Sequence, residues 1–305
     1  MKYIQLGKSG LNVPVVAVGC MRIGGLALQD ANRLIMTAIE RSANFFDHAD
    51  IYGGGGSEST FADALGMNSS VREKIILQSK CGIRKGMFDF SRGHILESVD
   101  GSLKRLKTDY LDVLLLHRPD ALMDPDEVAG AFDVLKSAGK VRHFGVSNQN
   151  PGQMALLQKS MDMPIVANQL QLSITNATMI SGGINVNMLN ESAVSRDDGV
   201  LNYCRLNDIT IQPWSPLQYG FFEGPFIGSD KHVEINKTLN VIAEKYGVTA
   251  TTIAIAWLLR HPAHMQPITG TRSPERLIEC LNAVDVTLTR EEWYEIYRAA
   301  GNILP

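Results

Sequence analysis

The chain has 305 residues, of which 45% are hydrophobic and 20% charged, and its formal net charge is −3. This composition supplies enough apolar material for a large core and excludes disorder as the main state. The near balance of 29 basic and 32 acidic residues argues against a surface for nucleic acid or anionic membranes. Apolar runs such as Val113–Leu116 are too short to cross a membrane, and the chain opens without a signal-peptide pattern.

The cysteines indicate a reducing compartment. All four are widely spaced and none forms a CxxC pair: Cys20, Cys81, Cys204 and Cys280. This pattern is typical of free thiols and offers no zinc framework. We therefore expect a cytoplasmic protein.

Taken in chain order, the sequence first predicts a hairpin, with strands Tyr3–Leu6 and Asn12–Val16 around the turn Gly7–Gly10. Short apolar strand patterns then alternate with longer amphipathic helical patterns. The predicted strands are Val15–Gly19, Phe45–Ala49, Ile75–Lys80, Tyr110–His117, Val141–Ser147, Ile165–Leu170, Thr210–Trp214 and Gln266–Gly270. The predicted helices are Asp30–Ser42 (with Asp30 as N-cap), Ser57–Leu65, Ser91–Leu106, Asp126–Ala138, Pro151–Lys159, Asp198–Asn207, Val233–Tyr246, Thr249–Arg260 and Pro274–Asn282.

Repeated strand–helix units imply parallel strands, and eight such units favour a closed barrel. A doubly wound sheet is the competing α/β solution. It normally carries a GxGxxG turn after its first strand, and Val18–Gly24 does not fit that motif. We predict an α/β chain folded as a single (β/α)8 TIM barrel domain over residues 1–305.

Two long polar loops, Ser173–Arg196 and Gln218–Lys231, follow the sixth and seventh predicted strands. Both lie after the carboxyl end of a strand, where barrel enzymes build their sites. Phe88, Tyr219 and Phe222 lie in loops of this kind and suggest a partly aromatic substrate pocket. Such loops vary freely on this fold, so the substrate itself stays open.

Four polar side chains stand at or just after the ends of three successive predicted strands: Asp47, Tyr52, Lys80 and His117. A tyrosine is a weak acid at neutral pH, and a nearby ammonium favours its phenolate and lowers its pKa. The ammonium needs a carboxylate partner to stay charged in a semi-buried site. A histidine can orient a substrate oxygen by a hydrogen bond. Such a set suits protonation of an oxyanion as hydride reaches a carbonyl carbon.

Each of these residues also has an ordinary structural explanation, as packing, a rim charge, a helix cap or a core histidine. Their equivalent positions on successive strands favour a catalytic role. Asp47, His48, Asp50 and His117 are also potential metal ligands. Adjacent strand residues point to opposite faces, however, and no HExxH spacing is present, so we expect no metal.

Several motifs together resemble the aldo-keto reductase superfamily, specifically bacterial NADP-dependent oxidoreductases. They span nearly the whole chain in the expected order: Leu6–Leu11, Phe46–Gly53, Lys140–Asn148, Asn168-Gln169, Trp214–Leu217 and Ile268–Arg276. The resemblance implies a (β/α)8 barrel closed at the bottom by the N-terminal hairpin. It also implies NADPH-dependent reduction of aldehydes or ketones, a small-molecule carbonyl substrate, and a catalytic tetrad of Asp47, Tyr52, Lys80 and His117 with Tyr52 as general acid.

The resemblance also implies a set of NADP(H) contacts. Ser147, Asn148 and Gln169 match the residues that hold the nicotinamide carboxamide, and Trp214 matches the residue that stacks on the nicotinamide ring. The other matching positions are Met21 and Arg22 in the first strand's loop, Asp47, the pyrophosphate segment Ser215, Pro216 and Leu217, and the adenosine end Gly270, Thr271, Arg272, Arg276 and Glu279. Cys280 stands where the family often has an adenine-contacting asparagine, so we do not include it.

A second function remains open on this fold. Some barrels of this type are cofactor-binding regulatory subunits that sense the redox state of a nucleotide, and the tetrad does not exclude this. NADPH oxidation with a panel of carbonyl compounds separates the two. The oligomeric state and the role of residues 173–196 stay open.

Overall fold

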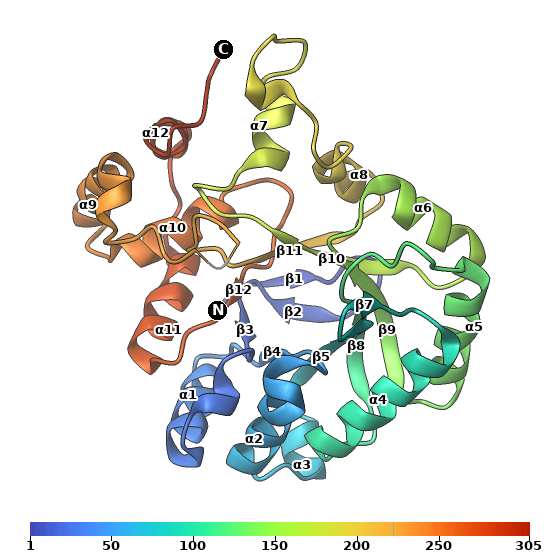
Figure 1. Ribbon diagram of the computed structural model, residues 1–305. Helices are drawn as coiled ribbons and strands as arrows, with labels where there is room; N and C mark the ends of the chain where they lie inside the picture. Colours follow the sequence, from blue (N-terminus) through green and yellow to red (C-terminus); the bar gives the residue numbers. More distant parts are fainter. Residues whose placement is uncertain (222) are drawn as a thin grey trace.

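The computed structural model describes residues 1–221 and 223–305, and its centre is a sheet of eight parallel strands. In spatial order they are β11 (Thr210–Trp214), β10 (Ile165–Gln171), β9 (Val141–Ser147), β8 (Leu111–Leu116), β5 (Ile76–Cys81), β4 (Phe45–Asp47), β3 (Ala17–Gly19) and β12 (Ile268–Thr269). The amide of Gln266, just before β12, donates to the carbonyl of Ile211 in β11 at 3.0 Å. The two edges therefore meet and the sheet curves into a barrel, as predicted (Figure 1).

Helices surround the strands on the outside, and a helical segment follows most of them (Figure 1). The described helices are α1 (Leu28–Glu40), α2 (Gly56–Leu65), α3 (Ser69–Arg72), α4 (Arg92–Leu106), α5 (Pro125–Ser137), α6 (Pro151–Ser160), α7 (Thr178–Ile184), α8 (Val200–Leu206), α9 (Val233–Tyr246), α10 (Ala250–Leu259), α11 (Pro274–Leu281) and α12 (Arg290–Ala299). Residues that favour helix initiation stand at the first positions of several of these helices. Asn150 and Gln153 form a capping box at α6, and Asp124 with Pro125 opens α5.

The hairpin of β1 (Tyr3–Gln5) and β2 (Asn12–Pro14) covers the amino ends of the strands, which confirms the expected bottom closure. Its turn fits tightly. The amide of Gly7 donates to Thr210 Oγ1 at 2.8 Å, and a Cβ on Gly7 would lie 2.4 Å from the carbonyl oxygen of Val166. A side chain at this position would clash with the carbonyl, and the φ of +51° at Gly7 independently favours glycine.

Two local predictions are corrected, and some elements were not predicted. The segment Ser173–Arg196 is not a plain loop, because it contains α7 and a 3₁₀ turn at Glu191–Ala193. Helix α1 begins at Leu28 after Ala27, so Asp30 lies in its first turn and is not the N-cap. Helix α12 was not predicted, although its Thr289–Glu292 capping box is visible in the sequence. A second hairpin, β6 (Ile83–Arg84) and β7 (Met87–Phe88), was missed because its strands have two residues each.

Within the described part of the chain, no helix combines the length and the apolar character that crossing a membrane requires.

Candidate active site

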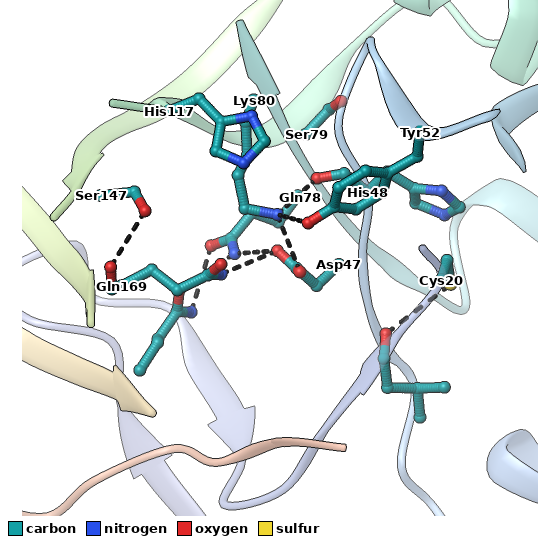
Figure 2. A network of polar contacts seen from close by, with 12 residues as sticks. Cys20, Asp47, His48, Tyr52, Gln78, Ser79, Lys80, His117, Ser147 and Gln169 are labelled. Atoms are coloured by element: carbon teal, nitrogen blue, oxygen red, sulfur yellow. Dashed lines mark hydrogen bonds and ion pairs between the residues drawn. The ribbon is translucent and has the colours of Figure 1, made fainter. Parts of the chain in front are cut away.

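The carboxyl ends of β4, β5 and β8 bring the four predicted catalytic residues together (Figure 2). Asp47 ends β4, Lys80 lies near the end of β5, and His117 directly follows β8. Tyr52 opens a 3₁₀ turn, η2 (Tyr52–Gly55), in the loop after β4. Parallel neighbouring strands end on the same side of a barrel, so residues far apart in sequence share one site.

Lys80 is the centre of the cluster. Its Nζ donates to Asp47 Oδ2 at 2.8 Å, to the carbonyl of His48 at 2.7 Å and to the Tyr52 hydroxyl at 3.2 Å. These three acceptors match the three hydrogens of an ammonium. Burial is the largest influence on the pKa of Lys80 and lowers it, but the electrostatic interactions and hydrogen bonds with Asp47 and Tyr52 together outweigh burial and raise the pKa overall. Lys80 is therefore charged although its side chain is fully buried.

The pKa of Tyr52 is raised above its ordinary value, mainly by burial. Lys80 lowers this pKa, as its positive charge should, and Asp47 raises it. Lys80 thus acts on this pKa in the predicted direction, but desolvation of the phenolate exceeds the attraction of the ammonium, so the pKa is raised overall. Tyr52 holds its proton and is available as a donor.

The loop that carries Tyr52 is tied to the strand that carries Lys80. The amide of His48 donates to the carbonyl of Gln78 at 2.8 Å, and the amide of Asp50 donates to the carbonyl of Lys80 at 3.0 Å. A run of glycines with positive φ, residues 53–55, then turns the chain into α2. The glycines make this reversal possible directly after the reactive tyrosine.

His117 lies beside Tyr52, with the two rings 5.9 Å apart and nearly perpendicular. Its pKa is well below the usual range because of burial and then the charges of Lys80 and Arg118. Its Nδ1 is buried with no hydrogen-bond partner among the described residues. A neutral imidazole in this place can direct a ring N–H or a lone pair at an oxygen held next to Tyr52.

The potential metal ligands do not converge. The ring of His48 is fully buried and packs against Phe61 with centroids 4.6 Å apart, and burial lowers its pKa to about 3. Over residues 1–221 and 223–305, no group of three His, Cys, Asp or Glu side chains is arranged to hold a metal ion.

The residues expected at the nicotinamide carboxamide form one hydrogen-bonded group at the ends of β9, β10 and β11. The indole N–H of Trp214 donates to Asn148 Oδ1 at 3.0 Å, and Asn148 Nδ2 donates to Ser147 Oγ at 2.7 Å. Ser147 Oγ in turn donates to the carbonyl of Gln169 at 2.9 Å. The amide of Gln169 donates to Asp47 Oδ1 at 3.0 Å, which joins this group to the catalytic cluster.

Three arginines gather at the ends of β3 and β12. Arg22 donates to the carbonyl of Gly270, and its pKa is lowered by burial and then by the charges of Arg272 and Arg276. Arg276 lies at the start of α11, whose N-cap is Ser273. No ion pair of these arginines with an acidic side chain is present among the described residues. The sequence predicted each of them as a cofactor contact, but it did not predict that Arg22 lies close enough to the other two to feel their charges.

The remaining predicted cofactor residues lie in the loops after β3, β11 and β12 or on α11: Met21, Ser215, Pro216, Leu217, Thr271 and Glu279. Among the predicted aromatic pocket residues, Tyr219 is half-buried and Phe88 is exposed, while Phe222 lies outside the described residues.

Sequence reasoning missed two features of the site. Arg118 lies over the rings of Trp214 and Phe221, at 5.5 and 5.6 Å from their centroids. The other feature is a set of buried glutamines, Gln78 and Gln212 among them, beneath Asp47. Gln78 shares the inward face of β5 with Lys80, so a polar residue at that alternating position was a usable signal.

Comparisons with known proteins agree with this arrangement. Residues 15–300 match the model of the Aldo/keto reductase family. The chain is 37% identical over 98% of its length to an uncharacterized oxidoreductase, YcsN, of Bacillus subtilis (strain 168), with 98% of that protein covered. It is 35% identical to a 6-dehydroglucose reductase of Agrobacterium fabrum, covering 87% of this chain and 86% of the other. The crystal structure of the thermostable aldo-keto reductase Tm1743 with the inhibitor epalrestat has a TM-score of 0.78 and 28% identity, and covers 98% of this chain and 100% of that one.

The parallel barrel and these relatives together place the chain among the (β/α)8 oxidoreductases. The chain belongs to the aldo-keto reductase family.

Proposed function

We propose that the chain reduces aldehyde or ketone carbonyls to alcohols with NADPH, and that Tyr52 is the general acid. The observation that carries this proposal is the position of Lys80 Nζ, within hydrogen-bond distance of both Asp47 and Tyr52. A fully buried ammonium beside a phenol stabilises the phenolate that remains after proton donation.

The residues present fit NADPH. The charges of Arg272 and Arg276 both act on Arg22, so three guanidinium groups share this corner of the site, and an anion among them would offset their mutual repulsion. Guanidinium groups bind phosphate oxygens in pairs, and the N-terminus of α11 adds its own attraction. We assign them to the 2′-phosphate and its surroundings. Ser147, Asn148 and Gln169 would hold the carboxamide, and Trp214 would lie against the ring.

When bound, NADPH supplies a hydride to the carbonyl carbon. Tyr52 donates its proton to the carbonyl oxygen, so the product is an alcohol and the tyrosine is left as a phenolate. Lys80 stabilises that phenolate, and Asp47 keeps Lys80 charged and in place. His117 orients the substrate oxygen toward Tyr52. Solvent returns the proton to Tyr52 after the turnover.

The test is steady-state oxidation of NADPH with a panel of carbonyl compounds that includes 6-dehydroglucose, the compound named for the Agrobacterium fabrum relative. Turnover with at least one member supports the proposal. Tight NADPH binding without turnover of any compound would favour a redox-sensing regulatory subunit. A cytoplasmic location and a single domain over residues 1–305 stay predictions.

A further inference from the structure

A chain of glutamine side chains runs through the barrel interior beneath Asp47. Gln78 lies on β5, Gln212 on β11 and Gln266 just before β12, and all three are fully buried. Their neighbours inside the barrel are otherwise mainly apolar, including Phe45, Val113, Leu115, Val166 and Ile268. Amide groups in such surroundings cost free energy unless each is hydrogen-bonded.

Each of the three glutamine side-chain amides is hydrogen-bonded. Gln78 Nε2 donates to Asp47 Oδ1 at 2.6 Å and to Gln212 Oε1 at 2.9 Å. Gln212 Nε2 donates to Gln78 Oε1 at 3.1 Å and to Gln266 Oε1 at 2.9 Å. Gln266 Nε2 donates to the carbonyl of Pro14 in β2 at 2.7 Å. The three glutamines therefore connect the carboxylate of Asp47 at the site with the hairpin at the opposite end of the barrel.

The groups at the two ends of this glutamine network only accept hydrogen bonds. Asp47 is paired with Lys80 as a carboxylate, and Pro14 offers a carbonyl. This leaves one consistent orientation for each amide. Gln78 must turn its NH₂ group toward Asp47, so its oxygen must accept from Gln212. Gln212 then donates to the oxygen of Gln266, whose NH₂ group faces Pro14. The three glutamines thus hold one another in a fixed direction.

Gln169 completes the environment of the same carboxylate oxygen. Its Nε2 donates to Asp47 Oδ1 at 3.0 Å and to Gln212 Oε1 at 3.3 Å. Asp47 Oδ1 therefore accepts from two amides, and Oδ2 accepts from Lys80. Rotation of the carboxylate would break hydrogen bonds on both sides, so the amides fix the oxygen that Lys80 uses.

We propose that Gln78, Gln212 and Gln266 form a positioning network that holds Asp47 in register with Lys80, and through Lys80 sets the place and acidity of Tyr52. The proposal rests on the function proposed above. A barrel filled with leucine and valine could pack as well, but it would leave Asp47 Oδ1 with a single amide donor. Fully satisfied polar networks of this kind specify one geometry.

The test substitutes Gln212, which touches neither Lys80 nor Tyr52. Gln212→Leu removes the donors to Gln78 and Gln266 at similar volume. Gln158→Leu is the matched control, because Gln158 also makes several side-chain hydrogen bonds, to Met161, Met163 and Ile165, far from the site. Both variants should lose thermal stability, since both leave hydrogen-bond partners unsatisfied.

We expect Gln212→Leu to lower kcat about tenfold, the effect of about one lost hydrogen bond, with the Kd of NADPH within about twofold of the wild type. Gln158→Leu should leave kcat unaltered. In the ligand-free protein, NMR of ¹³Cζ-labelled tyrosine, assigned with Tyr52→Phe, should show the Tyr52 phenol titrating at higher pH in Gln212→Leu, because Asp47 is less well compensated. If Gln212→Leu does not fold, Gln266→Leu, one step further from Asp47, provides the same measurements with a smaller expected effect.

An unaltered Tyr52 titration together with an unaltered kcat in a folded Gln212 or Gln266 variant would overturn the positioning role and leave only a structural one. The NMR titration needs no turnover. Failure of the wild type to reduce any carbonyl would therefore count against the proposed function, and failure of the titration to move would count against the network.

Discussion

The ammonium of Lys80 lies 3.2 Å from the hydroxyl of Tyr52, so a buried cation is hydrogen-bonded to the proposed proton donor. Asp47 lies on the other side of the ammonium at 2.8 Å. This order, carboxylate to ammonium to phenol, explains how a lysine with a fully buried side chain remains charged. A change that separates Lys80 from either partner should therefore disturb the proton donor.

Replacement of Lys80 by methionine should remove the charge that favours the Tyr52 phenolate and leave Asp47 buried without its cation. We expect kcat to fall by about 10²- to 10⁴-fold. The pKa of Tyr52, already raised by burial, should rise further. The check is the pH–rate profile for carbonyl reduction, with NADPH binding by fluorescence as the control for folding. A profile identical to that of the wild type would disprove the coupling of Lys80 to Tyr52.

Replacement of Arg276 by alanine should weaken NADPH binding roughly ten- to a hundredfold and leave NADH nearly unaffected. The reason is that only NADPH carries the 2′-phosphate that we assign to Arg22, Arg272 and Arg276. Fluorescence titration with both nucleotides measures the effect. Arg290→Ala, an exposed arginine at the start of α12, is the control. Equal losses for both nucleotides would mean that Arg276 does not recognise the phosphate.

Much of the site could be predicted from the sequence, because strand ends in a parallel barrel meet in one place. Asp47, Lys80 and His117 each stand at the end of an apolar run, so their convergence followed from the fold alone. The role of Tyr52 was less accessible. Its place beside Lys80 depends on the loop after β4, which the amide of Asp50 ties to the carbonyl of Lys80, and its raised pKa depends on burial that local sequence does not reveal.

The glutamine chain could not be predicted in the same way. Gln78, Gln212 and Gln266 are far apart in sequence, and each alone is an ordinary polar residue in or beside a strand. Their pairing depends on how the strands face one another across the barrel interior. Helix α7 was missed for a different reason, since its sequence contains two glycines and is short.

Asp50 should make the folded state less stable as the pH rises. Burial, and then the negative charge of Glu58, raises the pKa of Asp50 to about 6. The unfolded chain ionises near the ordinary value, so the stabilising contribution of the protonated form is complete below about pH 4 and is lost as the pH rises through about 6. Asp50→Asn, which stays neutral, should therefore stabilise the protein by about 3 kcal/mol near pH 8 and hardly at all near pH 4.

Denaturant unfolding of the wild type and Asp50→Asn at both pH values checks this prediction. Asp109→Asn, a change of the same chemistry at an exposed position, is the control for the substitution itself. A variant that is less stable than the wild type near pH 8 would show that the Asp50 carboxylate is well accommodated in its ionised form.

The most direct test of the proposed function is the Tyr52→Phe variant, assayed for NADPH oxidation with a carbonyl substrate that the wild type reduces. The substitution removes one hydroxyl and keeps the ring beside His117. We predict that kcat falls by about 10²- to 10⁴-fold while the Kd of NADPH, measured by fluorescence, stays unaltered. A variant that retains the wild-type kcat would contradict the assignment of Tyr52 as the general acid.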